Sequence, residues 1–218
     1  MLSSSVSSVS SVAKSMSINN IADYLTEMAR SRPETLALAV QRGAGRYREY
    51  SYGELARACE SIAAGFHRRG IGPGARVVVM LRPGFEFFAV VFALFRTGAV
   101  LVAVDPGIGL KHLGQCLAEA EPSVFIGNRK AHLARVLYGW ARATLTTRIA
   151  TQATPLPGVI PLSACMRAGA DSSHTTTAED DMAAILFTSG STGAPKGAVY
   201  THGNFLAQVN ALRDLYGI

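Results

Sequence analysis

Two kinds of apolar segment alternate through the middle of the chain. Residues 76–81 and 100–104 contain continuous apolar runs, which are typical of strands buried on both faces of a sheet. Residues 84–98 and 110–120 are longer segments that favour helices, and a short strand is expected at 123–126. Strands that alternate with helices predict parallel βαβ units. The pattern therefore predicts an α/β fold with largely parallel sheets and helices on both faces.

A helix, a hairpin and a second helix are expected ahead of this region. Residues 21–29 place apolar side chains on one helical face. Residues 35–41 and 46–50 flank a glycine-containing turn and predict a β-hairpin. Ser51 and Glu54 have the spacing of a capping box, so the second helix should begin there.

The last third of the chain starts with a segment that has little periodicity. Residues 144–178 are rich in Thr, Pro, Ala and Gly, and we expect a connector with some surface structure and at most one short strand, near Val159. Residues 182–187 then predict an apolar strand and residues 198–201 a short one. A helix with an apolar stripe is expected at 204–216.

The first 17 residues differ in composition from the rest of the chain. They are serine-rich and carry a single charge, on Lys14. A secretory signal needs a compact apolar stretch, which this segment lacks, and a transit peptide is disfavoured because no arginine precedes Arg30. We therefore interpret residues 1–17 as a disordered tail and residues 18–218 as the folded part.

Composition and charge narrow the class of protein. Hydrophobic residues make up 49% of the chain and charged residues 17%, which is typical of a globular protein. The net charge of +6 suits an anionic ligand such as ATP. No basic run with interleaved aromatic residues is present, which argues against nucleic-acid binding. The longest apolar run, residues 87–95, is much shorter than the roughly 20 residues of a transmembrane helix.

The three cysteines, Cys59, Cys116 and Cys165, indicate the redox environment. Their number is odd and no CxxC motif occurs, so neither a disulfide framework nor a zinc site is predicted. We expect buried free thiols and a reducing, cytoplasmic location.

The strongest candidate for chemistry is the segment FTSGSTGAPKG at residues 187–197. Its glycines let backbone N–H groups approach an anion closely. The hydroxyl side chains add neutral donors, and Lys196 adds a mobile positive charge. The segment is therefore predicted to bind phosphate. The alternative is a flexible Gly/Ser linker, which is disfavoured because a buried strand is predicted directly before it.

Two better-known phosphate-binding motifs are excluded by spacing. The Walker pattern fails because Pro195 stands where its second glycine is required. The dinucleotide pattern G-x-G-x-x-G fails at Gly70-Ile-Gly72 and at Gly107-Ile-Gly109, because Ala75 and His112 stand where the third glycine is required.

The segment TSGSTGAPKG at 188–197 resembles the phosphate loop of the adenylate-forming superfamily, which includes acyl-CoA synthetases, luciferases and peptide-synthetase adenylation domains. The order of elements before the loop is also similar, so the resemblance covers residues 18–218. Residues 82–88, 104–113 and 130–140 are most similar to the β-lactone synthetases of bacterial long-chain olefin biosynthesis. On this resemblance, the chain is the amino-terminal part of an AMP-binding domain.

The resemblance implies that a carboxylate is activated with ATP and Mg²⁺, with release of pyrophosphate. The acid would be a fatty acid or a long-chain β-hydroxy acid, and the adenylate would close to a β-lactone or pass to coenzyme A. Lys196 is the implied catalytic residue. The residues implied in gripping the β- and γ-phosphates are Thr188, Ser189, Gly190, Ser191, Thr192, Gly193 and Lys196.

Superfamily members are much longer than this chain, and their Mg²⁺, ribose and adenine ligands would lie beyond Ile218. We therefore expect a truncated fragment of a ligase that is inactive alone. The strand at 182–187 would then keep an open edge and an open apolar face. The alternative is a non-catalytic nucleotide-binding or interaction module that retains the phosphate loop.

Histidines and other candidates add no second site. No metal-binding spacing occurs among the histidines, so we expect most of them to be surface or partly packed side chains, and no metal site. His202 could face the phosphate loop, but the flanking Thr201 and Asn204 favour a helix start there. The histidines are His67, His112, His132, His174 and His202.

Two further groups are given structural interpretations. Asp180 and Asp181 precede the strand at 182–187 and are expected in a solvated acidic turn. Five phenylalanines between residues 85 and 95 could contact an acyl chain, but core packing is the favoured interpretation.

Overall fold

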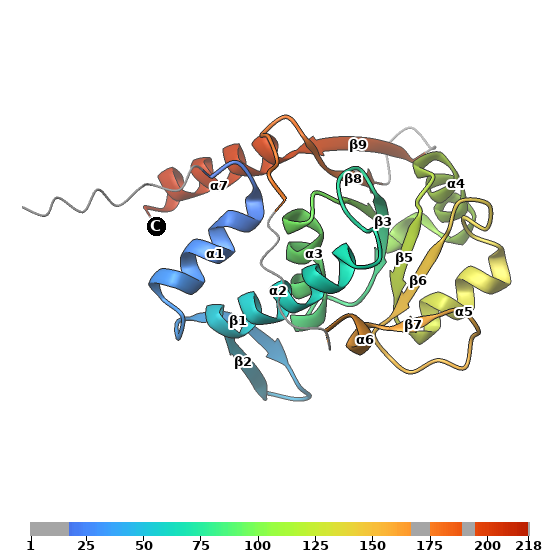
Figure 1. Cartoon of the computed structure of the whole chain (residues 1–218), viewed down its shortest axis with the longest axis horizontal. Helices are drawn as coiled ribbons and strands as arrows, with labels where there is room; N and C mark the ends of the chain where they lie inside the picture. Colours follow the sequence, from blue (N-terminus) through green and yellow to red (C-terminus); the bar gives the residue numbers. More distant parts are fainter. Residues whose placement is uncertain (1–17, 167–174, 189–194, 218) are drawn as a thin grey trace, which may run out of the picture.

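The computed structural model describes residues 18–166, 175–188 and 195–217 (Figure 1). The predicted tail at 1–17 lies outside these residues. In the described ranges, a seven-stranded sheet runs in the order β7 (Ile160–Pro161), β6 (Thr147–Ala150), β5 (Val124–Gly127), β3 (Arg76–Met80), β4 (Val100–Val104), β8 (Met182–Thr188) and β9 (Lys196–Thr201). Every neighbouring pair is parallel except β8 and β9. The largely parallel sheet is therefore confirmed.

Helices cover both faces of this sheet, as predicted, and each face has its own core. Residues of α1 (Ile21–Ser31), α2 (Tyr52–His67) and α3 (Phe85–Arg96) pack on one face, where they contact alternate residues of the strands such as Val77 and Leu101. Residues of α4 (Leu110–Ala120) pack on the other face with Val78 and Val102. Successive strand residues point to opposite faces, which explains why the apolar runs are continuous.

The segment that we expected to be a connector with surface structure contains buried structure, and that part of the prediction is wrong. The short strand expected near Val159 does form, as β7. The segment holds β6, β7 and α6 (Leu162–Met166). Ile149 and Cys165 have no exposed surface. The carbonyl oxygens of α6 accept hydrogen bonds from α2, including one of 2.7 Å from Ser61 Oγ to Met166 O. Helix α5 (Arg129–Tyr138) also forms where no helix was predicted.

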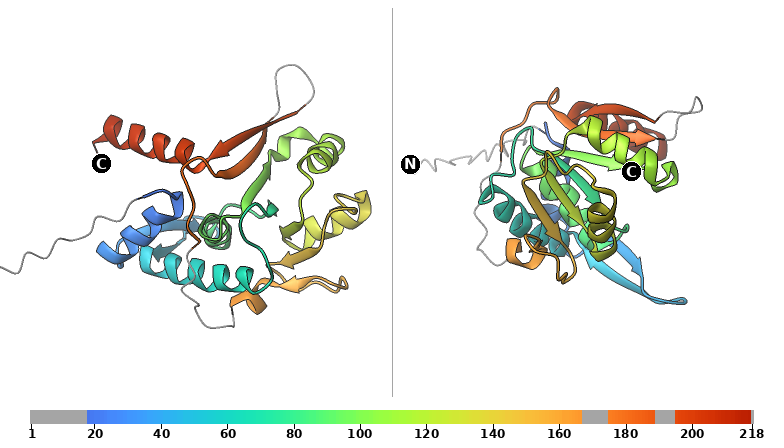
Figure 2. Two further views of the ribbon diagram at one scale, coloured as in Figure 1. Left: turned by 45° about the horizontal axis from the view of Figure 1, so that its top comes forward. Right: turned by 90° about the vertical axis from the view of Figure 1, so that its right-hand side faces the viewer.

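The hairpin of β1 (Leu36–Gln41) and β2 (Tyr47–Ser51) is a separate antiparallel sheet that projects from the main body (Figure 2). The capping box that follows it is confirmed. Glu54 N donates to Ser51 Oγ at 3.3 Å, and Ser51 N donates to the Glu54 carboxylate at 2.8 Å. These bonds satisfy amide groups that the first turn of α2 would otherwise leave unpaired.

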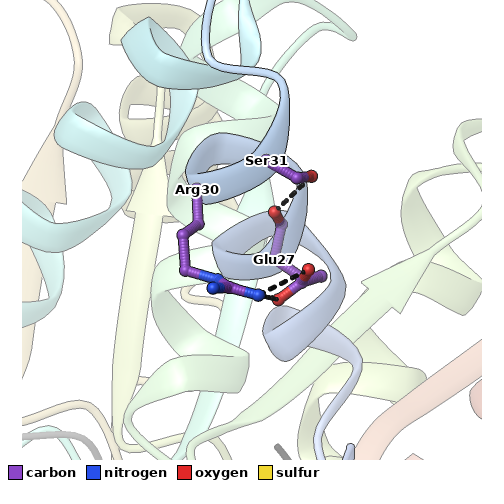
Figure 3. Close-up of polar contacts among 3 residues, drawn as sticks. All are labelled: Glu27, Arg30 and Ser31. Atoms are coloured by element: carbon purple, nitrogen blue, oxygen red, sulfur yellow. Dashed lines mark hydrogen bonds and ion pairs between the residues drawn. The ribbon is translucent and has the colours of Figure 1, made fainter. Parts of the chain in front are cut away.

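Helix α1 lies beside α7 (His202–Tyr216), far apart in sequence but adjacent in space (Figure 1). Tyr24 Oη donates to Asn210 Oδ1 at 3.2 Å between them. The outer end of α1 carries an ion pair of 3.0 Å between Arg30 and Glu27, and Ser31 Oγ donates to Glu27 O (Figure 3). Because the Arg30 side chain is 74% exposed, this pair contributes only a few tenths of a kcal/mol.

Strand β8 has a neighbour on each side, β4 and β9, so the expected open edge at 182–187 is wrong. The outer strand is β9 instead, and Val199 on it is 55% exposed.

The three cysteines are buried free thiols, as predicted. Burial raises the pKa of Cys59 to about 12, although Arg96 acts to lower it. None of the helices in the described ranges has the length and hydropathy needed to cross a bilayer.

Candidate functional site

The predicted phosphate loop connects two hydrogen-bonded strands. Strand β8 runs through the sheet and ends at Thr188, and β9 returns from Lys196. Thr188 and Lys196 lie directly opposite each other in the antiparallel register, and both are exposed. The two ends of the segment are therefore held together by the sheet. Ser189, Gly190, Ser191, Thr192 and Gly193 lie outside the described residues.

The base of the loop is fixed by a close contact between a glycine and an aromatic ring. Gly197 pairs with Phe187, whose side chain is buried. A Cβ atom at Gly197 would lie 2.9 Å from two atoms of the Phe187 ring and 3.2 Å from Ile185. Only glycine leaves room for the ring at this position. The glycine after the lysine therefore has a packing role in addition to the chemistry of the loop.

The turn after β4 adds further donors at the same edge of the sheet. Asp105 N donates to Phe187 O at 3.1 Å, which ties this turn to the end of β8. The Asp105 carboxylate in turn accepts from Gly107 N at 2.8 Å. Helix α4 begins directly afterwards, and its N-cap residue, Gly109, has no side chain to cap the first amides. The positive end of α4 therefore faces the edge of the sheet where β8 ends.

A basic cleft lies between the hairpin and the carboxyl ends of the strands. It has a volume of about 520 Å³ and is lined by Arg42, Arg48 and Arg82, with Glu86 as its acidic side chain. The buried Tyr50 anchors two of the arginines: Arg48 stacks over its ring at 4.9 Å and Arg42 donates to its hydroxyl at 3.5 Å. Among the described residues, these three arginines form no ion pair. Their charge suits an anionic group.

A smaller hollow of about 310 Å³ continues this cleft between the ends of β3, β5 and β6. The order in which successive strands are added to the sheet reverses here, because β4 lies on one side of β3 and β5 lies on the other. Ligands of open α/β sheets bind at such points. No single sequence motif marks this region, because its residues come from separate segments: Leu81, Arg82, Glu86, Asn128, Lys130, Thr151 and Gln152.

His202 does not belong to the phosphate loop. The predicted helix start is confirmed: Thr201 and Asn204 form a capping box at the start of α7, with Asn204 N donating to Thr201 Oγ1 at 3.2 Å. Strand β9 separates His202 from Lys196 by six residues, or about 20 Å along the strand. His202 is fully buried, and its Nδ1 accepts from Ile21 N at 3.4 Å.

The expectation of surface or partly packed histidines is wrong for His202 and also for His132, which has no exposed surface. His132 Nε2 lies 2.9 Å from Ile149 O. Burial lowers the pKa of both imidazoles below the usual 6.5. The hydrogen bond to Ile149 opposes this for His132, and Asp181 and Asp23 oppose it for His202. Both rings are structural, because neither lines a described cleft.

The remaining candidates have structural roles. The Asp181 carboxylate accepts from Ala178 N at 2.8 Å, which stabilises the predicted acidic turn. Phe95 is buried, and the other phenylalanines of α3 pack partly buried against the same core. In the described ranges, no group of three or more His, Cys, Asp or Glu side chains could hold a metal ion. The donors that surround the ends of the loop are hydroxyl, amide and ammonium groups, which fit phosphate oxygens.

Comparisons with known proteins agree with this arrangement. The AMP-binding enzyme family matches residues 25–217. The chain is 47% identical over 205 residues to the olefin beta-lactone synthetase of Xanthomonas campestris, and the match covers 90% of this chain and 37% of that relative. The Stenotrophomonas maltophilia protein of the same name is 46% identical, with 91% and 38% covered. The acetoacetyl-CoA synthetase of Streptomyces lividans has a similar fold (TM-score 0.78, 22% identity, 87% of this chain and 31% of that chain).

Proposed function

Because the chain belongs to the AMP-binding enzyme family, we propose that it supplies the triphosphate-binding part of an ATP-dependent, AMP-forming carboxylate ligase. The observation that carries the proposal is the glycine- and hydroxyl-rich segment held between the paired ends of β8 and β9. Strands that fix both ends of a loop lower the entropy lost when the loop closes on a ligand. The chain spans somewhat more than a third of the length of the curated relatives that it matches.

In the proposed reaction, a carboxylate oxygen of the acid attacks the α-phosphorus of ATP. A bond forms between that oxygen and the phosphorus, and the bond from the phosphorus to the bridging oxygen breaks. Pyrophosphate leaves with the electron pair, so negative charge grows on the β-phosphate. Donors that contact the β- and γ-oxygens stabilise this charge and orient the leaving group for in-line displacement.

The roles of individual residues follow from the chemistry of their side chains. Lys196 is the catalytic residue of the proposal, because its exposed ammonium can neutralise the leaving pyrophosphate. The hydroxyl of Thr188 lies opposite it at the base of the loop. The other residues of the proposed grip supply hydroxyl and backbone N–H donors: Ser189, Gly190, Ser191, Thr192 and Gly193. Mg²⁺ would arrive with the nucleotide, and no described side chain is assigned to it.

The substrate proposed for the complete reaction is a fatty acid or a long-chain β-hydroxy acid. The names of the two most similar relatives reported above support the second, because a β-hydroxyl group can displace AMP from the adenylate and close a β-lactone. Transfer of the acyl group to coenzyme A is the alternative outcome. The buried free thiols suit a reducing compartment such as the cytoplasm.

Nucleotide binding by the 218-residue chain tests the grip directly. We expect Lys196→Ala to weaken ATP binding roughly 10- to 100-fold in isothermal titration calorimetry, because a charge-assisted hydrogen bond to phosphate is lost. The control is Arg213→Ala, which removes an exposed cation from the last turn of α7. Equal affinity of the Lys196 variant and the unaltered chain would contradict the role of that ammonium.

A chimera tests the reaction itself and separates the ligase from a non-catalytic module that only binds nucleotide. Residues 18–218 replace the matching region of the Xanthomonas campestris relative, to which they are 47% identical. We expect ATP–pyrophosphate exchange that depends on a long-chain β-hydroxy acid and that falls when Lys196→Ala is introduced. A folded chimera that binds ATP without any exchange would favour the module.

A further inference from the structure

Unlike an ordinary surface helix, α5 buries two polar side chains and exposes several large apolar ones. Its buried residues are His132 and Arg135, which a helix normally exposes. Its exposed residues include four large apolar side chains: Leu133 (60%), Val136 (52%), Leu137 (73%) and Tyr138 (51%). Leu133, Val136 and Leu137 have the i, i+3, i+4 spacing that places them on one helical face. That face is therefore an apolar strip on the surface of the protein.

The rotation of α5 that exposes this strip is fixed by specific contacts. The Asn128 side chain caps the amino end by accepting from Ala131 N at 2.9 Å. On the inner face, His132 Nε2 donates to Ile149 O and the Arg135 guanidinium lies 5.8 Å above the Phe125 ring. Turning the helix to bury the apolar strip would break these contacts. The apolar exposure is thus a property of the fold.

The segment that carries the strip is basic. Five basic residues and no acidic residue lie between positions 128 and 148. Arg129 and Lys130 are exposed in the first turn of α5, on the same face as Leu133. Cations in the first turn of a helix are unfavourable with respect to its dipole, so these two side chains do not stabilise the helix. They do place positive charge beside the apolar strip.

A groove extends the apolar surface beyond the end of α5. It has a volume of about 630 Å³ and lies between α4 and residues 138–144. Leu117 and Trp140 line it, and the Tyr138 ring stacks on Trp140 at 5.5 Å. Arg142 and Glu121 also line it. Tyrosine and tryptophan combine an apolar ring with a polar atom, which suits the boundary between water and lipid.

We propose that the α5 face, defined by Arg129, Lys130, Leu133, Val136, Leu137 and Tyr138, docks on an anionic membrane surface. The apolar strip enters the boundary between headgroups and acyl chains, and Arg129, Lys130 and Arg142 contact lipid phosphates. Helix α5 lies at the opposite end of the molecule from α7 in both Figure 1 and the left view of Figure 2, so α7 does not cover this face. The inference is independent of the proposed ligase function.

The positive charge of the α5 face favours a membrane over a second copy of the chain as its partner. A symmetric dimer through this face would bring two basic segments together, and their repulsion opposes association. Acidic lipid headgroups neutralise the same charges. Complementary charge therefore favours the membrane, and self-association becomes an outcome of the test.

The test is co-sedimentation of the 218-residue chain with vesicles. Vesicles of phosphatidylglycerol and phosphatidylcholine should bind the chain, and vesicles of phosphatidylcholine alone should bind it much less. The double variant Leu133→Ser, Leu137→Ser should bind roughly tenfold less, because the apolar insertion is lost. The matched control is Leu212→Ser, Leu215→Ser on α7, whose side chains are 50% and 73% exposed, and it should bind like the unaltered chain.

Two further measurements keep the result interpretable. Circular dichroism must show the same helix content for both double variants, which is expected because all four side chains are exposed. Raising the salt from about 0.1 M to about 1 M shortens the screening length from about 10 Å to about 3 Å, and should weaken binding. The proposal is overturned by equal loss in both double variants, by no binding to anionic vesicles, or by a dimer that the α5 variant abolishes while vesicle binding persists.

Discussion

Asn20 is a single side chain that joins three parts of the fold. It caps α1 by accepting from Ala22 N at 2.8 Å, and its amide donates to Phe95 O at 2.7 Å and to Thr177 Oγ1 at 2.9 Å. Asn20 is only 1% exposed, so water cannot replace these bonds.

Asn20→Ala should therefore lower the free energy of unfolding by about 2 to 4 kcal/mol, from a lost cap and an unpaired buried carbonyl. Urea denaturation measures the change. Asn210→Ala is the matched control, because Asn210 is exposed and its Oδ1 accepts a hydrogen bond of 3.2 Å from Tyr24 Oη. It should change stability by less than about 0.5 kcal/mol. Similar losses in the two variants would contradict this role of Asn20.

Single residues differ in how far their roles can be predicted from sequence. The capping pairs at Ser51 and Thr201 were predictable because both partners are local and three residues apart. The burial of His132 was not, because its partner, Ile149, lies 17 residues away on a strand that was not predicted. Gly197 was recognised only as the last residue of the phosphate-binding segment, because its contact with Phe187 depends on a strand pairing that periodicity cannot show.

At the scale of elements, Gly65 sets how closely α2 approaches α6. A Cβ atom at this position would lie 2.7 Å from the Cα and carbonyl carbon of Cys165, and backbone cannot move aside as a flexible side chain can. Gly65→Ala should destabilise the protein by about 1 to 3 kcal/mol, although alanine favours a helix by up to about 1 kcal/mol.

Gly114→Ala in α4 is the matched control for this substitution. Its Cβ would meet Trp140 at an ordinary 3.5 Å, so the helix preference of alanine should dominate and stability should rise by about 0.5 to 1 kcal/mol. Thermal unfolding measures both changes. Opposite signs are expected, and a stabilising Gly65→Ala would show that α6 does not pack tightly on α2.

Uniform burial made three strands of the main sheet easy to place from the sequence. Strands β3, β4 and β8 are covered on both faces, so their apolar runs are continuous and their positions were predicted closely. Strand β6 and helix α6 are short, with four and five residues, and too few positions show a period. Helix α5 was missed because His132 and Arg135 face inward while Leu133 and Leu137 are exposed, so its pattern does not identify a core-facing apolar stripe.

At the scale of the whole molecule, the chain order predicted the parallel sheet but not its strand order. The basic cleft depends on that order, since Arg82 follows β3 whereas Arg42 and Arg48 come from the hairpin. The two ends of the phosphate loop could be predicted because one continuous segment contains them. Sites that one segment forms are therefore accessible to sequence analysis, whereas sites that topology assembles require the structure.

Stability of the whole fold should depend on pH through its two buried histidines. Burial lowers the pKa of His132 and of His202 below the usual 6.5, so the unfolded chain takes up these protons at a higher pH than the folded chain. Above about pH 6.5 both states are neutral at these sites, and their contribution to stability is complete. As the pH falls below this value, the unfolded state gains protons first, and stability decreases until the folded imidazoles titrate.

We expect the urea midpoint to stay level above about pH 7 and to fall between about pH 6.5 and pH 5. Each histidine contributes at most about 1.4 kcal/mol per pH unit to the slope of the free energy of unfolding against pH. The double variant His132→Gln, His202→Gln should be less stable at neutral pH, because buried hydrogen bonds change, but its stability should decrease less steeply across this range. His112→Gln is the control, since His112 is not buried and its Nδ1 lies 2.9 Å from Gln115 Oε1 on the same helix, and it should keep the full slope. If the double variant keeps that slope too, the acid sensitivity comes from carboxylates, and the two imidazoles titrate alike in the folded and unfolded chain.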